Sequence, residues 1–317
     1  MSLSSIIRST EPECKAIREI IRTTAPLKNS FNTFSGLPAF SKYSIINEYQ
    51  LENSFQSSIV GTAFDILTKI ICSYYTNSKF NTDDLMQFWI AKYLHENEDV
   101  QKLYYDAQNI VDEVINPNII TKISLSCDLI ASVWLFAKLE VLWRSGFIKN
   151  AEKNDVIASP SDIVKQDLMT MGQSFIENFI DTGLVKSNSL ITYNPDFSTD
   201  VELKLGGIVA DICIDNTLYD IKSTKKLGFS IQDSIQLTAY YLFYLLDRLM
   251  SIDVDDVLLQ RHEIKRIAFY KSRYGQIEYF NVEDIPLNIL INALIELNRR
   301  FELGITESKI IEIGDYK

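Results

Sequence analysis

The stretch GIVADICIDNTLYDIK, residues 207–222, decides the expected fold. Two short apolar runs rich in isoleucine flank the pair Asp215-Asn216, whose residue types tolerate the backbone conformations of a tight turn. A hairpin with this tip makes Asp211 and Asp220 cross-strand partners on one face, because both lie equally far from it. Lys222 lies two residues beyond Asp220, so the alternation of side chains along a strand directs it to the same face. One surface of the ribbon is therefore predicted to carry two carboxylates and one ammonium.

Short runs of strand-forming residues surround this hairpin, whereas much of the remaining chain has helical periodicity. Turn residues such as Asn-Pro-Asp and Gly-Gly separate the runs. The order of helices, a strand cluster, a helix, two strands and a helix predicts an α/β fold, a mixed β-sheet flanked by helices. Strands are expected at 190–193, 201–210, 212–214, 217–222, 265–270 and 276–280, and helices at about 58–75, within 82–183, at 230–250 and at 286–301.

The composition is that of a soluble globular protein with a sizeable core. The chain has 317 residues, of which 46% are hydrophobic and 23% charged. This length suits one large domain or two ordinary ones. The sequence opens without the charged segment and long apolar run of a signal peptide, and no run of about eighteen apolar residues is uninterrupted. We therefore expect a cytoplasmic protein with no membrane partner.

The cysteines and histidines are widely scattered. No two cysteines have the spacing of zinc ligands or of a redox pair. We expect reduced thiols in the core, and neither a structural zinc site nor an iron–sulfur cluster. The residues are Cys14, Cys72, Cys127, Cys213, His95 and His262.

The opposed carboxylates of the hairpin suggest a metal-dependent chemistry. Asp211 and Asp220 repel each other unless a cation compensates them. Mg²⁺ takes oxygen ligands and keeps positions for water and substrate phosphate oxygens. A metal held there polarises a phosphodiester and activates water, while Lys222 orients that water or stabilises developing negative charge. The alternative is a carboxylate beside a turn and a solvated Asp-Lys surface pair; the apolar neighbours Ile212 and Ile214 favour burial instead.

The helix that follows adds a second motif. Gln236 and Tyr240 are four residues apart and hence lie on one helix face, although for this pair taken alone core packing of Tyr240 beside an incidental Gln236 is the better explanation. Taken in order, the three motifs resemble those of the PD-(D/E)xK nuclease superfamily, most of all its RecB-like branch. The resemblance covers residues 189–244 well and 265–301 more loosely. Its residues are Gly207-Ile-Val-Ala-Asp211, Asp220-Ile-Lys222 and Gln236-Leu-Thr-Ala-Tyr240.

This resemblance implies a restriction-endonuclease-like core and a hydrolase that uses Mg²⁺ or Mn²⁺. Asp211 and Asp220 are then metal ligands. Ile221, which lies between Asp220 and Lys222, is included in the metal site with them. Lys222 is the catalytic lysine. Gln236 and Tyr240 lie beside the site and hold substrate or active-site geometry. The proline that the family places before the first aspartate is replaced by alanine in this chain.

The family also places a helical acid or histidine upstream at the metal, and two residues compete for this position. Gly61-Thr-Ala-Phe-Asp65 resembles the G-T-x-x-H helix of RecB-like nucleases, with Asp65 in place of the histidine. Glu177, on the helix just before the strands, is the other candidate. An ordinary solvated helix charge explains Asp65 equally well, and it explains Glu177 better than a metal ligand does. We prefer Asp65, since a carboxylate there still suits Mg²⁺.

With Asp65 in the site, the chain divides into three parts. Residues 1–75 form an N-terminal helical part with the first motif helix, 76–183 a helical insertion, and 184–317 the nuclease core. The insertion is a lid, a specificity element or an oligomer surface, and the sequence leaves these open. A homo-oligomer or a larger nuclease complex is compatible with each.

DNA, single- or double-stranded, is the expected partner, although the net charge of −11 counts against a nucleic-acid-binding protein. RNA, exonuclease or endonuclease action and sequence specificity stay open. Two other interpretations remain: a nuclease-fold module that has lost catalysis and serves in binding, and a helical interaction protein with an accidental motif. The expected local basic surface for phosphates comprises Lys225, Lys226, Arg261, Lys265, Arg266, Lys271 and Arg273.

Overall fold

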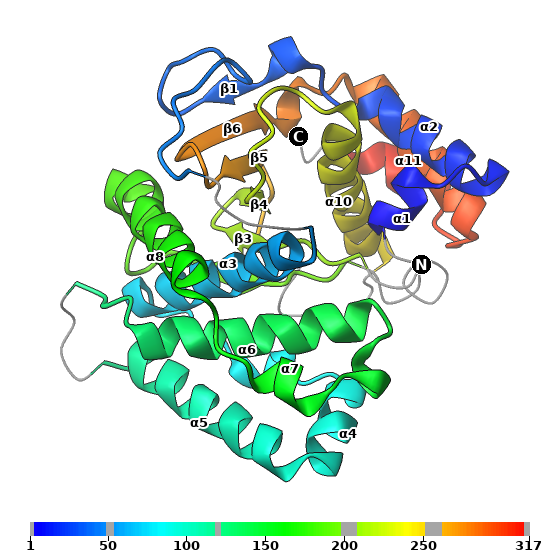
Figure 1. Ribbon diagram of the computed structural model, residues 1–317. Helices are drawn as coiled ribbons and strands as arrows, with labels where there is room; N and C mark the ends of the chain where they lie inside the picture. Colours follow the sequence, from blue (N-terminus) through cyan, green and yellow to red (C-terminus); the bar gives the residue numbers. More distant parts are fainter. Residues whose placement is uncertain (1–2, 49–53, 118–121, 198–207, 251–261, 314–317) are drawn as a thin grey trace.

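A six-stranded mixed β-sheet forms the centre of the computed structural model, which describes residues 3–48, 54–117, 122–197, 208–250 and 262–313 (Figure 1). The strand order is β1-β6-β5-β4-β3-β2, in which β4 and β5 are parallel and each other pair is antiparallel. The predicted α/β class with a mixed sheet is thus confirmed. The strands are β1 (Asn32–Thr33), β2 (Ile191–Tyr193), β3 (Ile212–Ile214), β4 (Thr217–Lys222), β5 (Arg266–Lys271) and β6 (Gln276–Asn281).

Helices cover both faces of the sheet. The N-terminal helices are α1 (Leu3–Arg8), α2 (Pro12–Thr24) and α3 (Ser54–Tyr75). Then come α4 (Phe88–Glu96), α5 (Glu98–Ile115), α6 (Cys127–Arg144), α7 (Lys153–Ile157), α8 (Asp162–Phe175) and the π-helical η4 (Ile176–Leu184). The C-terminal helices are α10 (Ile231–Met250), α11 (Leu287–Phe301) and α12 (Glu307–Ile311). Short 3₁₀ turns are η1 (Lys28–Ser30), η2 (Thr82–Leu85), η3 (Ile148–Asn150) and η5 (Val282–Asp284).

The alternation of side chains along the strands divides the core in two. Ile212 and Ile214 of β3 belong to the apolar cluster that includes α3, α5, α6 and α8, whereas Cys213 between them belongs to the cluster that includes α1, α2, α10 and α11. On β4, Leu218 belongs to the α10 side and Tyr219 to the α3 side. The sheet therefore lies between two helical layers. The predicted run 201–210 lies mostly outside the described residues.

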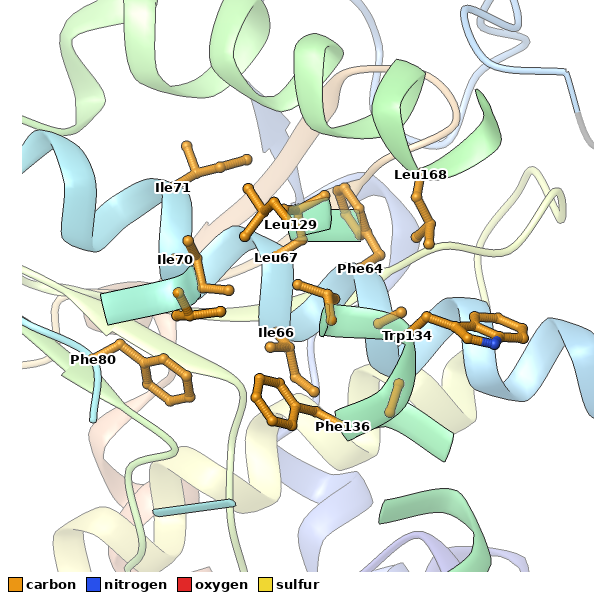
Figure 2. Packing of buried hydrophobic residues seen from close by; sticks show 14 of the residues in the cluster. Phe64, Ile66, Leu67, Ile70, Ile71, Phe80, Leu129, Trp134, Phe136 and Leu168 are labelled. Carbon is orange, nitrogen blue, oxygen red and sulfur yellow. The ribbon is translucent and has the colours of Figure 1, made fainter. Parts of the chain in front are cut away.

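Helix α3 is the central helix of one layer and lies between the sheet and α6 (Figure 1). Ile66, Leu67, Ile70 and Ile71 are fully buried, and Figure 2 shows them among side chains of α6 and α8. By length and composition, residues Phe55–Tyr75 could also cross a membrane, a test that buried core helices pass as well. Of the window that passes this test, 61% is buried inside the protein.

The helices between α3 and β2, which we expected as an insertion, share one apolar cluster with α3 and one face of the sheet. Close packing helps to join them: a Cβ at Gly172 of α8 would lie 3.1 Å from Leu67 of α3. Serine caps begin two of these helices. Ser126 accepts a hydrogen bond from Leu129 N, and Ser161 one from Val164 N. The helical region is thus packed continuously onto the layer that carries Asp65.

Candidate functional site

The β3–β4 hairpin has the predicted turn and register. Asp215 begins the two-residue turn with a φ of +50°, and Ile212 pairs with Tyr219. One further step in this register sets Asp211 opposite Asp220. The Asp211 carboxylate accepts a hydrogen bond of 2.6 Å from the backbone N–H of Ile221. Leu218 faces α10. Asp220 and Lys222 lie two and four residues beyond it on the same strand, so they face α10 as well.

Asp220 and Lys222 form an ion pair at the end of β4. Lys222 Nζ lies 2.7 Å from Asp220 Oδ2, although no described group meets hydrogen-bond geometry at that oxygen. Burial raises the pKa of Asp220, and Lys222 acts in the opposite direction. For Lys222, burial favours the neutral amine, but Asp220 and the neighbouring carboxylates outweigh it and raise its pKa. The lysine is therefore an ammonium at neutral pH.

Asp211 is a strongly perturbed carboxyl of the site. Burial, followed by repulsion from Asp65 and Asp220, raises its pKa to about 8. Lys69 and the Ile221 N–H act in the opposite direction. Asp211, directly before β3, thus lies close enough to Asp65 of α3 and to Asp220 of β4 to be repelled by both, an arrangement that favours a cation.

Asp65 enters this group with a partner that the sequence interpretation missed. Lys69, one helical turn along α3, places its Nζ 2.6 Å from Asp65 Oδ2. The same Nζ donates a 2.5 Å hydrogen bond to Asn194 Oδ1, and the backbone N–H of Asn194 donates one of 3.1 Å to Asp211 O. Lys69 is only 2% exposed. The i, i+4 spacing of Asp65 and Lys69 was the available signal; Asn194, with a φ of +47°, gave none.

Glu177, the competing upstream candidate, has a different setting. Its side chain is exposed on η4 and accepts a 2.6 Å hydrogen bond from Gln173 Nε2. It is not among the main charges that act on Asp211 or Asp220. Of the two upstream candidates, the structure therefore brings Asp65 to the hairpin carboxylates and not Glu177.

The two motif residues of α10 are joined to each other beside the carboxylates. Gln236 Nε2 donates a 2.8 Å hydrogen bond to Tyr240 Oη. Burial, then the charges of Asp220 and Asp211, raise the pKa of Tyr240. The tyrosine is therefore a neutral phenol close to both aspartates.

The start of α10 also contributes to the site. Ser230 Oγ accepts a hydrogen bond of 3.2 Å from the backbone N–H of Asp233, as in one half of a capping box. The Asp233 carboxylate then acts on both Asp220 and Lys222. This acid was not among the expected site residues.

The helical region contributes charges as well. Glu140 and Arg144, one turn apart near the end of α6, form an ion pair. Burial raises the pKa of Glu140; Arg144 and Lys69 oppose this, and Asp65 adds to it. Arg144 also acts on Tyr240. The end of α6 therefore lies beside the site, which nothing in the sequence indicated.

Gly61 of the upstream motif lets α3 approach the hairpin. A Cβ at this position would lie 3.2 Å from Ser223 Oγ, directly after Lys222. This is tighter than most Cβ contacts, so a larger residue would require Ser223 Oγ or α3 to shift by a few tenths of an ångström. The glycine thereby allows the close approach of α3 to the end of β4.

The donor set fits a hard divalent cation. The oxygen donors are carboxylates, and Asp65 Oδ1 is buried without a hydrogen-bond partner among the described residues. Over the same residues, no three His, Cys, Asp or Glu side chains are gathered as a ready metal-binding group. The ammonium groups of Lys69 and Lys222 lie against the carboxylates instead. These residues could hold a metal after small shifts of side chains.

The predicted basic surface for phosphates is wrong at two of its residues. Arg273 is 1% exposed and holds both carboxylate oxygens of Asp167, so its guanidinium is not available to a ligand. Lys271 is also buried, 3.6 Å from Glu278. Arg261 lies outside the described residues. The described members that are at least partly exposed are Lys225, Lys226, Lys265 and Arg266.

Comparisons of the chain with known protein families, with curated proteins and with solved structures found no match. The interpretation of the site therefore rests on the motif residues and on their geometry.

Proposed function

We propose that the protein is a nuclease that hydrolyses DNA phosphodiester bonds with Mg²⁺ or Mn²⁺ held by Asp211 and Asp220. One observation carries the proposal: two mutually repelling carboxylates, the buried Asp220 and the partly buried Asp211, share a hairpin face with an ammonium, Lys222. The Gln236–Tyr240 pair lies beside them, in the motif order of RecB-like nucleases. A restriction-endonuclease-like core is part of the proposal, supported by a mixed sheet between helical layers.

Each side chain has a distinct task. Asp211 and Asp220, with Asp65 Oδ1 and the Ile221 position beside them, hold the metal ion, which when bound polarises the phosphodiester and acidifies a water molecule. Lys222 has a raised pKa and therefore remains an ammonium. It donates hydrogen bonds to the attacking water and to the charge that develops on the phosphate, and does not remove a proton.

Gln236 and Tyr240 keep the α10 side of the site in position. The Gln236 amide donates to Tyr240 Oη, which leaves the phenol hydrogen free to donate elsewhere. Because the pKa of Tyr240 is raised, that hydrogen is retained over the working pH range. Tyr240 therefore acts as a neutral donor beside the two aspartates.

A cleavage assay tests this function. At least one of linear, circular and single-stranded DNA should be cut in Mg²⁺ or Mn²⁺ and left intact in EDTA, and the substrates that are cut distinguish exonuclease from endonuclease action. Asp220→Ala and Lys222→Ala should each lower the rate by at least about a thousandfold, since each removes a group that acts on the transition state. Asp162→Ala, at a carboxylate whose side chain is 98% exposed on α8, is the matched control and should cut normally. Undiminished cleavage by both site variants would contradict the proposal.

A catalytically silent nuclease-fold module is the second candidate, and two observations favour it. The net charge is −11, and Asp65 is held by the ammonium of Lys69. Such a module binds nucleic acid or protein without hydrolysis. Calorimetry with Mn²⁺ distinguishes the two: binding that is lost in Asp211→Asn and Asp220→Asn supports the nuclease, and its absence supports the silent module.

A further inference from the structure

Lys69 is a buried cation that the proposed chemistry does not use. Its side chain is 2% exposed on α3, between the fully buried Ile66 and Ile70. An ammonium in such surroundings is strongly destabilising unless it is paired and hydrogen-bonded. Lys69 has both kinds of partner, because it lies 2.6 Å from Asp65 Oδ2 and donates 2.5 Å to Asn194 Oδ1.

The contacts of Lys69 fix it beside the metal-binding carboxylates. Asp65 comes from α3, whereas Asn194 comes from the turn after β2. The backbone N–H of Asn194 donates to Asp211 O, so this turn is itself tied to the start of β3. The ammonium thus bridges α3 and the turn after β2, which both lie beside Asp211. Its charge lowers the pKa of that aspartate.

The charges of the site leave little room for two metal ions. Six carboxylates and four cations lie in and around it, so that full ionisation leaves two negative charges. One divalent ion neutralises this charge, and a second ion would leave two uncompensated positive charges in a poorly solvated place. The carboxylates are Asp65, Glu140, Asp211, Asp220, Asp233 and Glu278, and the cations are Lys69, Arg144, Lys222 and Lys271.

We infer that Lys69 takes the place of a second metal ion, so that the site binds a single divalent cation; this rests on the proposed function. The two carboxylate oxygens of Asp65 have different partners, the ammonium of Lys69 and the metal ion. Its Oδ2 is held by Lys69, and its Oδ1, buried without a described hydrogen-bond partner, is left for the metal. In two-metal sites the ions lie about 3.5–4 Å apart. A second ion shared through Asp65 would therefore meet the fixed ammonium.

Electron paramagnetic resonance of bound Mn²⁺, together with calorimetry, tests this count. The wild-type protein should bind one Mn²⁺ per chain with the six-line spectrum of an isolated ion. Lys69→Met should gain a second Mn²⁺, spin-coupled to the first and bound at least about tenfold more tightly than any second ion of the wild type. Lys69→Arg keeps the charge and is the matched control, with one isolated ion. Asp65→Asn with Lys69→Met should also bind only one ion, because the second needs Asp65.

Each result decides the inference. A spin-coupled Mn²⁺ pair in the wild type overturns it, and so does a folded Lys69→Met that binds one ion with wild-type affinity. If thermal melting shows that Lys69→Met does not fold, the wild-type spectrum alone decides. Absence of any Mn²⁺ binding that depends on Asp211 and Asp220 contradicts the proposed function itself, which separates the two failures.

Discussion

Two groups of buried charges in this protein differ in how completely they are paired. At the β5–β6 turn, the Arg273 guanidinium holds both oxygens of Asp167 on α8, one of them at 2.7 Å, and donates to Ser223 O at 3.2 Å. At the hairpin, Asp65 Oδ1 has no described hydrogen-bond partner, and Asp220 Oδ2 meets only an ammonium outside hydrogen-bond geometry. The first group is satisfied within the protein, and the second is not.

This difference separates a structural ion pair from a candidate site. A buried pair that is fully hydrogen-bonded fixes the elements it joins, since removing one partner leaves an isolated charge. Carboxylates that repel one another and lack donors favour the binding of a cation, and strongly perturbed groups of this kind cluster at functional sites. The two groups also meet: Arg273 holds the carbonyl of Ser223, which follows Lys222. The satisfied pair therefore supports the end of β4.

The largest expected effect is the loss of stability when the Arg273–Asp167 pair is broken. Arg273→Met should lower the free energy of unfolding by about 3–5 kcal/mol, because it leaves Asp167 buried without its partner. Urea denaturation measures this loss. Arg299→Met is the control: Arg299 also pairs with carboxylates, but its side chain is 59% exposed, so this substitution should lower the free energy of unfolding far less. Equal losses in the two variants would remove the contrast between the groups.

The next effect is a gain in stability, expected when Asp211 is replaced. Its pKa is raised to about 8 in the folded state by burial and neighbouring carboxylates, from an ordinary value near 3.8. The folded protein then binds more protons than the unfolded chain between these values, so the contribution of Asp211 to stability is full below about pH 4 and is lost as the pH rises to about 8. Asp211→Asn should therefore be more stable than the wild type at pH 8, by about 1–3 kcal/mol.

Denaturation curves between pH 5 and 8 in EDTA check this prediction. The wild type should lose up to ~1.4 kcal/mol per pH unit relative to Asp211→Asn. Saturating Mn²⁺ should reverse this difference, because the metal binds the ionised carboxylate. Parallel curves for the two proteins in EDTA would show that Asp211 belongs with the satisfied charges.

The local part of the site could be predicted from the sequence. Spacing alone gave the turn at Asp215, the face shared by Asp211 and Asp220, and the Gln236–Tyr240 pair, because strand and helix periodicity act over a few residues. The helix of 230–250 and the strands of 265–280 were likewise found within a residue or so. These features depend on neighbours in the chain.

The partners of these residues could not be predicted. Arg273 was expected at a phosphate-binding surface, but its partner Asp167 lies 106 residues away, and nothing local shows that the arginine is buried. The same holds for Asn194, 125 residues from Lys69, and for the end of α6 beside Asp65. Packing between distant segments decides which charges are covered, and periodicity carries no information on it.

The smallest expected effect distinguishes a site tyrosine from a core tyrosine on the same helix. Tyr240→Phe removes a hydroxyl that accepts from Gln236, whose amide is partly exposed and can turn to water. The cost in stability should be below about 1 kcal/mol. Under the proposed function, Mn²⁺ affinity should fall about tenfold, since the phenol lies beside Asp211 and Asp220.

Tyr244→Phe is the matched control, one turn further along α10. Tyr244 Oη donates 2.7 Å to the carbonyl of His262, and both residues are buried. Its loss leaves a buried carbonyl without this donor and should cost about 1–3 kcal/mol while Mn²⁺ affinity is unchanged. If Tyr240→Phe also lowers the stability and leaves the Mn²⁺ affinity unchanged, Tyr240 is a core residue. The site then consists of Asp211, Asp220 and Asp65 without Tyr240. If the two variants differ as expected, α10 presents its apolar face to the core and its motif residues to the metal site.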